Sequence, residues 1–193
     1  MLGAQGHYVS NYISTNLPII FSELINDREQ TKNPKEALHF SYKKIFENLI
    51  SSEIDITFSG STAVTCYLQG QKIYVANSGD SRAIIGTKVS KNIWFVKELT
   101  RDHKPELREE FSRIKNKGGR VAACLDPFGR PSGPKRVWLK NDCIPGLAMS
   151  RSIGDLVAAS VGVTWKPGKP KSKFFFNFKK FHFFLIFVRN KEV

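Results

Sequence analysis

Three of four short phrases of the sequence combine glycine with serine, aspartate or arginine, and the remaining one holds arginine, aspartate and histidine; these residue types build tight turns and ligand sites. In chain order, the phrases are Ser59-Gly60-Ser61-Thr62-Ala63, Asn77-Ser78-Gly79-Asp80-Ser81-Arg82, Leu99-Thr100-Arg101-Asp102-His103-Lys104-Pro105 and Gly146-Leu147-Ala148-Met149-Ser150-Arg151-Ser152-Ile153-Gly154-Asp155. Mg²⁺ and Mn²⁺ bind hard oxygen ligands, which aspartates on loops or at strand ends provide. Asp80 and Asp155 also fit ordinary structural roles, because Asp80 after Gly79 is typical of a turn and Asp155 suits a helix N-cap.

Helical spacing dominates the first fifty residues. Residues 6–25 carry apolar positions at helical spacing and are interrupted by Pro18, which predicts two short helices. Asn33 suits the N-cap of the next helix, Pro34 its first position and Glu36 the acidic position of a capping box. This helix carries one apolar stripe made of Leu38, Tyr42, Ile45, Phe46 and Leu49.

The middle of the chain changes to strand periodicity. The predicted strands are residues 62–68, 72–76, 82–85, 93–99, 120–123 and 136–139, with a hairpin turn at Gly70-Gln71. Between the fourth and fifth strands, a helix is predicted from Pro105, with one apolar face of Leu107, Phe111 and Ile114, and it ends at Gly118-Gly119. Helices followed by consecutive strands indicate an α+β fold rather than a repeat of parallel βαβ units.

The composition limits the classes of protein. A chain of 193 residues suits one domain, and its net charge of +13 invites a nucleic-acid interpretation. However, residues 166–193 hold eight basic residues against one acidic residue, so about half of the excess lies in this tail. The remainder has no nucleic-acid recognition motif, and we therefore expect no nucleic-acid partner.

The cysteines and termini indicate an intracellular protein, cytoplasmic or nuclear. Cys66, Cys124 and Cys143 are odd in number and lack paired spacing, which predicts reduced and mostly buried thiols. The N-terminus shows no secretory signal. The longest apolar run of the tail is the six residues Phe183–Val188, too short to span a bilayer, so we expect no transmembrane segment.

The four phrases, with Gly118-Gly119-Arg120-Val121 between the third and the fourth, resemble the metal-dependent (PPM-type, class 2C) protein Ser/Thr phosphatases over residues 6–163. The resemblance implies two packed, mostly antiparallel β-sheets flanked by helices, with a metal centre at one end of the sandwich. It also implies that two Mg²⁺ or Mn²⁺ ions activate water to hydrolyse phosphoserine or phosphothreonine in protein substrates. It further implies that no covalent phosphoenzyme forms, so we expect none of the three cysteines to act as a nucleophile.

The same resemblance assigns roles to individual residues. Asp155 would bind one of the two core ions, and Asp80 would help to hold a weaker additional ion. Ala159 stands where some members carry an Asp that supports this additional ion. The motif residues with an expected structural role are Ser61, Thr62, Gly79, Arg82 and Gly154. We expect His103 to be structural and His7 to lie in a helix, because the family's proposed general acid is a histidine in an Asp-Gly-His-Gly motif.

Parts of the family pattern are missing from this sequence. Asp-Gly-His-Gly would precede Gly6, and a further metal-binding Asp-Asn motif would follow Asp155, yet Glu192 is the only acidic residue after Asp155. We therefore expect a partial domain over residues 1–165, truncated at both ends, monomeric and inactive by itself. A non-catalytic, pseudophosphatase-like binding module is the alternative.

Residues 166–193 form a basic, Phe/Lys-rich tail that we expect to lie outside the fold. The tail contains eight of the fifteen phenylalanines and follows no clean period. A/T-rich codons encode such a composition, which favours translated non-coding sequence. A basic-aromatic membrane-surface patch is the alternative for this segment.

Overall fold

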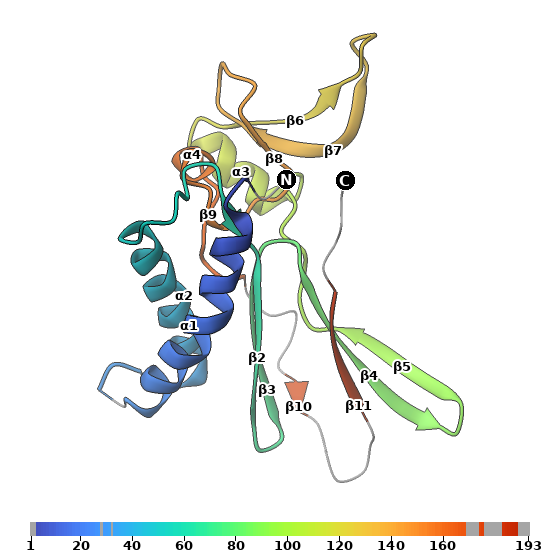
Figure 1. Cartoon of the computed structure of the whole chain (residues 1–193). Helices are drawn as coiled ribbons and strands as arrows, with labels where there is room; N and C mark the ends of the chain where they lie inside the picture. Colours follow the sequence, from blue (N-terminus) through green and yellow to red (C-terminus); the bar gives the residue numbers. More distant parts are fainter. Residues whose placement is uncertain (1–2, 28, 32, 169–173, 176–182, 189–193) are drawn as a thin grey trace.

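The computed structural model describes residues 3–27, 29–31, 33–168, 174–175 and 183–188 (Figure 1). Two long helices lie along a β-hairpin, and shorter elements gather at one end of this arrangement. The helices are α1 (Gly6–Asn26), α2 (Pro34–Ile50), α3 (Arg108–Asn116) and α4 (Leu156–Ser160). Named strands pair only in the antiparallel sense within the described residues, which confirms the α+β class.

The strands form short ladders built mainly on hairpins. One hairpin joins β2 to β3, a second joins β4 to β5, and a third joins β6 to β7 and is extended by β8. The bounds are β1 Gly60–Ser61, β2 Ala63–Gln69, β3 Lys72–Ser78, β4 Arg82–Ser90, β5 Ile93–Glu98, β6 Arg120–Leu125, β7 Pro131–Trp138, β8 Pro145–Leu147, β9 Ile153–Gly154, β10 Phe174–Phe175 and β11 Phe183–Val188. Each predicted strand appears, and β7 begins five residues early because its pairing with β6 continues past a bulge.

The N-terminal helices pack through a continuous apolar row. The prediction of two short helices is wrong, because Pro18 lies inside the single helix α1. The buried row of α1 recurs every four residues on both sides of the proline, at Val9, Ile13, Leu17 and Phe21. Burial of this row in the core shared with α2 outweighs the cost of about 3 kcal/mol that a proline brings to a helix interior.

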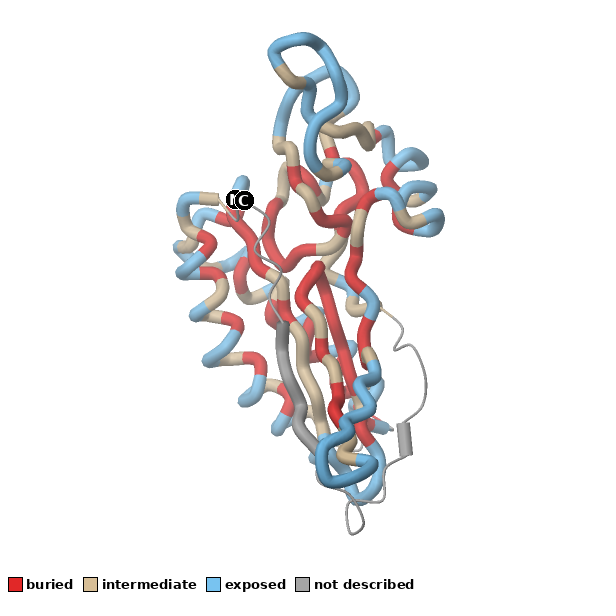
Figure 2. Tube along the Cα trace, turned by 90° about the vertical axis from the view of Figure 1, so that its right-hand side faces the viewer, coloured by how far each residue is buried: buried red, intermediate tan, exposed pale blue. Residues whose placement is uncertain are grey.

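α2 links the helix pair to the first hairpin. Asn33 caps α2 as predicted, and its Oδ1 accepts hydrogen bonds from two backbone N–H groups at 3.1 and 3.2 Å. Tyr42 is fully buried, and its hydroxyl lies 3.1 Å from the carbonyl oxygens of Ala63 and Ala76. Burial raises the pKa of Tyr42 above its ordinary value. Buried residues follow the inner faces of the helices and the adjoining strands (Figure 2).

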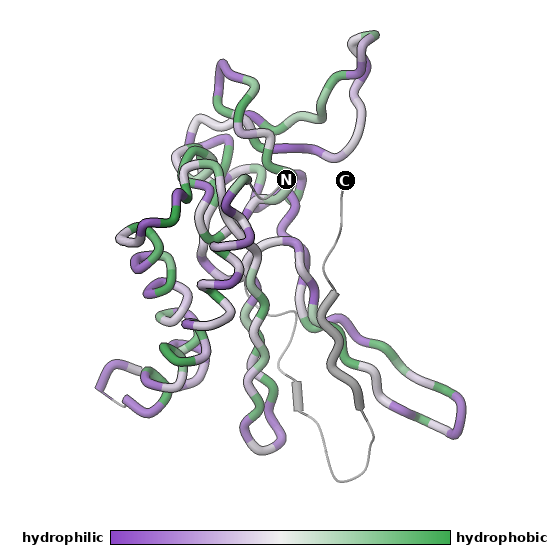
Figure 3. The backbone as a smooth tube through the Cα atoms, viewed as in Figure 1, coloured by the Kyte–Doolittle hydropathy of each residue, from purple (hydrophilic) through white to green (hydrophobic). Residues whose placement is uncertain are grey.

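The second hairpin projects from the molecule and exposes apolar side chains. β5 lies at the edge of its described ladder, and hydrophobic positions continue along this hairpin toward its tip (Figure 3). The exposed apolar residues of β5 are Ile93, Trp94, Phe95 and Val96. The sheet therefore ends in an unpaired edge and an uncovered apolar surface within the described residues.

α3 buries a different face from the predicted one. Phe111 was expected on the buried face but is 39% exposed, whereas Glu110 and Ile114 are buried. An acidic residue occupies this face because arginine side chains surround its carboxylate, as described below. The helix also begins at Arg108 rather than at Pro105.

Part of the tail differs from the expectation that it lies outside the fold. Phe174–Phe175 pairs with β3, and Phe183–Val188 pairs with β4. Both stretches are rich in phenylalanine, which favours strands, and each meets a strand whose other edge is already paired in a hairpin. The predicted boundary at residue 165 stays a prediction, and the remaining tail residues from 169 onward lie outside the described part.

Two further expectations concern thiols and membranes. The prediction of mostly buried thiols is wrong for Cys124 and Cys143, which are exposed at β6 and after β7, whereas Cys66 is half-buried. Burial raises the pKa of the Cys66 thiol to about 12. Among the helices in the described ranges, none combines the length and apolar content needed to cross a bilayer.

Candidate metal site

The pairing of β1 with β9 brings the first and fourth phrases together. Gly60 lies opposite Gly154 in this short ladder. The backbone N–H of Asp155 donates a hydrogen bond of 2.9 Å to the carbonyl oxygen of Ser59. The fold thus places Asp155 directly beside the Ser59-Gly60-Ser61-Thr62 turn, although the two phrases are far apart in the sequence.

Glycine is required on both sides of this junction. A Cβ atom added to Gly60 would overlap the Asp155 carboxylate, and one added to Gly154 would overlap the carbonyl oxygen of Ser59. Gly154 also has a φ of +106°, a conformation that favours glycine. The backbone at Gly60 therefore passes very close to the Asp155 carboxylate, which is buried.

Asp155 is a buried carboxylate with one side-chain hydrogen-bond partner among the described residues. Its exposed fraction is 3%, and the Ser152 hydroxyl donates a 2.6 Å hydrogen bond to Oδ2. Burial raises the pKa of Asp155 to about 6, although the Ser152 hydrogen bond acts in the opposite direction. No lysine or arginine of the described residues forms an ion pair with it. A bound cation would supply the countercharge that these residues do not provide.

The helix-cap alternative for Asp155 receives no side-chain support. Asp155 does occupy the N-cap position of α4, but its side chain makes no capping hydrogen bond, and its φ is 49°. A non-glycine residue in this left-handed region is uncommon and is found mainly in turns and at functional sites. The backbone turn therefore aims the carboxylate at β1 rather than at the first turn of α4.

Asp80 lies in a different electrostatic environment. It sits in the turn between β3 and β4, and its Oδ2 forms an ion pair of 2.9 Å with Nζ of Lys104. The resemblance implies an additional metal ion at Asp80. The ammonium group of Lys104 lies at this carboxylate instead. Within the described ranges, no three His, Cys, Asp or Glu side chains gather closely enough to hold a metal ion.

The turn that carries Asp80 is held by the other motif residues. Gly79 has a φ of +107°, and a Cβ atom there would overlap the Thr62 side chain. The Thr62 and Ser81 hydroxyls lie 2.7 Å apart. Arg82 binds both carboxylate oxygens of Asp102, at 2.8 and 2.9 Å. These contacts fit the expected structural roles and join the first, second and third phrases.

His103 connects this turn to the fourth phrase. Its Nδ1 lies 2.9 Å from the carbonyl oxygen of Gly79, and its own carbonyl accepts a 2.9 Å hydrogen bond from the Ser150 N–H. Burial, with the nearby Arg151 charge, lowers the pKa of His103 to about 4. The imidazole is therefore neutral at pH 7 and buried, an arrangement that fits the structural role expected for it.

Glu110 was missed by the sequence analysis. Its carboxylate is 1% exposed and accepts hydrogen bonds from Arg113, Ser150 and Arg151. Burial alone would raise the pKa of Glu110, but these hydrogen bonds outweigh that effect and hold it at about 2. The available signal was its spacing, because Glu110 precedes the buried Ile114 by one helical turn and so shares its face.

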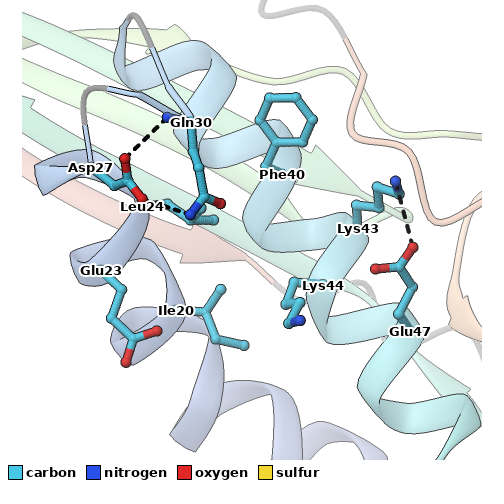
Figure 4. A pocket seen from close by; sticks show the side chains of 9 residues that line it. All are labelled: Ile20, Glu23, Leu24, Asp27, Gln30, Phe40, Lys43, Lys44 and Glu47. Atoms are coloured by element: carbon cyan, nitrogen blue, oxygen red, sulfur yellow. Dashed lines mark hydrogen bonds and ion pairs between the residues drawn. The ribbon is translucent and has the colours of Figure 1, made fainter.

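A pocket lies elsewhere, between the outer parts of α1 and α2 (Figure 4). Its charged lining residues are of both signs: Glu23, Asp27, Lys43, Lys44 and Glu47. Lys43 and Glu47 pair with each other at 3.6 Å and are half exposed. None of the four phrases contributes to this pocket, so we assign it no part in the candidate metal site.

The sequence was compared with family models, curated proteins and solved structures. The model named "Protein phosphatase 2C" matches residues 1–169, which is most of the chain and includes all four phrases. The chain belongs to the protein phosphatase 2C family. The phosphatase resemblance seen in the four phrases is thereby confirmed.

Relatives in this family are longer than the chain. "Probable protein phosphatase 2C 35" of Arabidopsis thaliana is 34% identical over 179 residues, covering 86% of this chain and 50% of the relative. "Probable protein phosphatase 2C 72" of the same plant is 36% identical over 173 residues, covering 86% of this chain and 51% of the relative. The chain thus spans about half the length of these protein phosphatase 2C relatives.

A solved structure supports the fold independently. "Crystal structure of serine-threonine phosphatase 2C from Toxoplasma gondii" superimposes with a TM-score of 0.64 at 20% identity, covering 99% of this chain and 61% of that chain. At this identity, the likeness concerns the fold alone. It confirms that the mixed helices and antiparallel sheets form a protein phosphatase 2C arrangement.

The described part of this protein phosphatase 2C chain fits one ligand position rather than a complete two-metal centre. Asp155 is buried and has the hard oxygen donors that suit a Mg²⁺ or Mn²⁺ ligand, and none of the described lysines or arginines forms an ion pair with it. Asp80 is neutralised by Lys104. A single carboxylate cannot hold two ions in register, so we derive no hydrolytic step from these residues.

Replacing Ser152 with alanine should weaken the binding of Mn²⁺ to the chain about tenfold, because hydrogen bonds that orient a ligand contribute to metal affinity on this scale. The change removes the only side-chain hydrogen bond to Asp155 that is seen among the described residues. Ser160→Ala is the matched control, since that hydroxyl is exposed and its one hydrogen bond within the described ranges goes to the Val157 carbonyl. Equal Mn²⁺ affinities in titrations of both variants would show that Ser152 does not orient the ligand.

Proposed function

We propose that this chain contributes part of the metal centre of a protein serine/threonine phosphatase, with Asp155 as a ligand of Mg²⁺ or Mn²⁺. The observation that carries the proposal is the Asp155 carboxylate itself, which is buried at the β1–β9 junction and hydrogen-bonded to Ser152. Its charge has no lysine or arginine partner among the described residues. A divalent cation at this position would remove the cost of burying that charge.

The reaction that we propose is hydrolysis of phosphoserine or phosphothreonine in protein substrates. Membership of the protein phosphatase 2C family supports this reaction class. Bound divalent ions would lower the pKa of a water molecule and neutralise the phosphoryl oxygens. We place the activity in a protein of the length of the matched relatives, acting as a monomer in the cytoplasm or nucleus. The 193-residue chain by itself is expected to be inactive.

A non-catalytic module that binds phosphorylated proteins is the second candidate. The ion pair between Lys104 and Asp80 favours it, because an ammonium group neutralises this carboxylate without any metal ion. Binding of a phosphopeptide in the presence of EDTA, with no turnover when Mn²⁺ is added, would distinguish this candidate from a metal-dependent phosphatase.

Mn²⁺ titration of the purified chain tests the proposed function. The electron paramagnetic resonance signal of free Mn²⁺ should fall as the wild-type chain is added, and Asp155→Asn should abolish this effect. Asp142→Asn is the control, since Asp142 is exposed and accepts a hydrogen bond from Arg120 through its backbone carbonyl oxygen, which the substitution keeps. Failure of the wild-type chain to bind Mn²⁺ would refute the role of Asp155. In parallel, substantial Mn²⁺-dependent hydrolysis of a phosphopeptide would refute the expected inactivity.

A further inference from the structure

We propose that Glu110, through its buried carboxylate, positions the fourth phrase of the sequence and with it Asp155. This inference rests on the proposed metal role of Asp155 and adds a residue from a distant helix to that site. Glu110 lies in the first turn of α3, and neither the family match nor the four phrases points to it.

Glu110 is the centre of a dense hydrogen-bond network. Its Oε2 accepts hydrogen bonds from the Ser150 hydroxyl at 2.6 Å and from Nη2 of Arg113 at 2.8 Å. Its Oε1 accepts one from Nη2 of Arg151 at 2.6 Å, and Nε of Arg151 lies 3.1 Å from Oε2. Three charged or hydroxyl donors thus converge on one carboxylate, and two of them belong to the fourth phrase.

The two arginines extend the network to the backbone on both sides of Asp155. Arg113 donates to the carbonyl oxygens of Ser150, at 2.7 Å, and of Gly162, at 2.8 Å. Arg151 donates to the carbonyl oxygen of Lys166 at 2.8 Å. The chain enters and leaves the β9–α4 region through these points, so Glu110 determines where both ends of the segment with Asp155 are held.

The charges explain why the carboxylate is needed. The side chains of Arg151 and Arg113 are 16% and 28% exposed, so water solvates neither of them fully. Without Glu110, two guanidinium groups would face each other across Ser150 with no anion between them. Their repulsion would move the backbone of residues 150–152, which bears the Ser152 hydroxyl that is bonded to Asp155.

A purely structural role predicts a different pattern from a positioning role. General stabilisation of the fold would change hydrogen exchange across the helices and hairpins alike. A positioning role changes exchange mainly in residues 147–156, and it changes Mn²⁺ affinity in the same variants. The two roles can therefore be separated by where and in which variants the effect occurs.

The test combines hydrogen exchange with Mn²⁺ binding on the full 193-residue chain. Glu110→Gln should raise amide exchange in residues 147–156 about tenfold more than in α2, and it should weaken Mn²⁺ binding about tenfold. Glu110→Asp keeps the charge and should restore part of both effects. Glu109→Gln is the matched control, because Glu109 is 70% exposed and pairs only loosely with Arg101, at 3.4 Å.

The outcomes separate this inference from the proposed function. Uniform exchange in Glu110→Gln, or an equal effect in Glu109→Gln, would overturn the positioning role. If Glu110→Gln does not fold, Arg151→Lys takes its place, because a lysine cannot bind the Glu110 carboxylate and the Lys166 carbonyl together. Unchanged amide exchange in residues 147–156 of Arg151→Lys would overturn the inference. A wild-type chain that binds no Mn²⁺ would refute the metal role of Asp155, while the exchange data would still decide whether Glu110 positions the phrase.

Discussion

Replacing Glu110 with glutamine is expected to lower the free energy of unfolding by about 3 kcal/mol at pH 7. The change leaves Arg113 and Arg151 without their shared anion in a region that is largely closed to water. We place the effect at the lower end for a broken buried ion pair, because both arginines keep hydrogen bonds to backbone carbonyls. Urea denaturation of the wild-type chain and of Glu110→Gln measures the difference.

Acid should remove the same stabilisation from the wild-type chain. The pKa of Glu110 is about 2 in the folded chain, against an ordinary value of 4.5. The folded state therefore keeps a charged carboxylate where the unfolded state binds a proton. Stability from this group is complete above about pH 4.5 and falls by about 3 kcal/mol as the pH drops toward 2. The free energy of unfolding of the control Glu109→Gln should depend on pH as that of the wild-type chain does. If Glu110→Gln showed the same pH dependence as these two proteins, the prediction would be contradicted.

Replacing Asp155 with asparagine is expected to stabilise the metal-free chain at pH 7 by about 2 kcal/mol. Asparagine keeps the shape and can still accept the Ser152 hydrogen bond, but it removes a buried negative charge that has no basic partner among the described residues. When Mn²⁺ is present, the wild-type chain should instead be more stable than Asp155→Asn, because only the wild-type chain gains stability from the bound ion.

Thermal unfolding in EDTA and in Mn²⁺ tests this reversal. Asp142→Asn is the control for loss of one exposed carboxylate, and it should match the wild-type chain in both conditions. If Asp155→Asn is less stable than the wild-type chain in EDTA, then the carboxylate stabilises the fold directly, and its proposed role as a site for a cation fails.

Local signals in the sequence predicted the elements but not all of their packing. The Asn33-Pro34 start of α2 is encoded by residues next to each other, and the structure confirms it. The break expected at Pro18 was wrong, because the stabilisation of α1 comes from contacts with α2 that no local rule contains. Likewise, the pairing of Phe183–Val188 with β4 depends on an available strand edge elsewhere in the chain.

The candidate site was predictable in part. Asp155 and Asp80 followed from the phrases, and the structure places both in buried turns. Lys104, the partner of Asp80, belongs to the third phrase, whereas Asp80 belongs to the second. Their ion pair therefore requires the fold to bring the two phrases together. Glu110 shares a helix face with the buried Ile114, but this spacing alone does not predict its burial, because an acidic residue in a helix is usually exposed. Only the convergence of two arginines on it shows its importance.

The contact between β1 and β9 has a consequence for the order of folding. Ser61 and Ser152, which meet there, are 91 residues apart in the chain, whereas each hairpin is closed by a short turn. Local hairpins form first, since closing a long loop costs more entropy and takes longer. During synthesis, β1 can therefore pair with β9 only after the fourth phrase has been synthesised. We expect the environment of Asp155 to be completed only after the hairpins have formed, as one of the latest steps of folding.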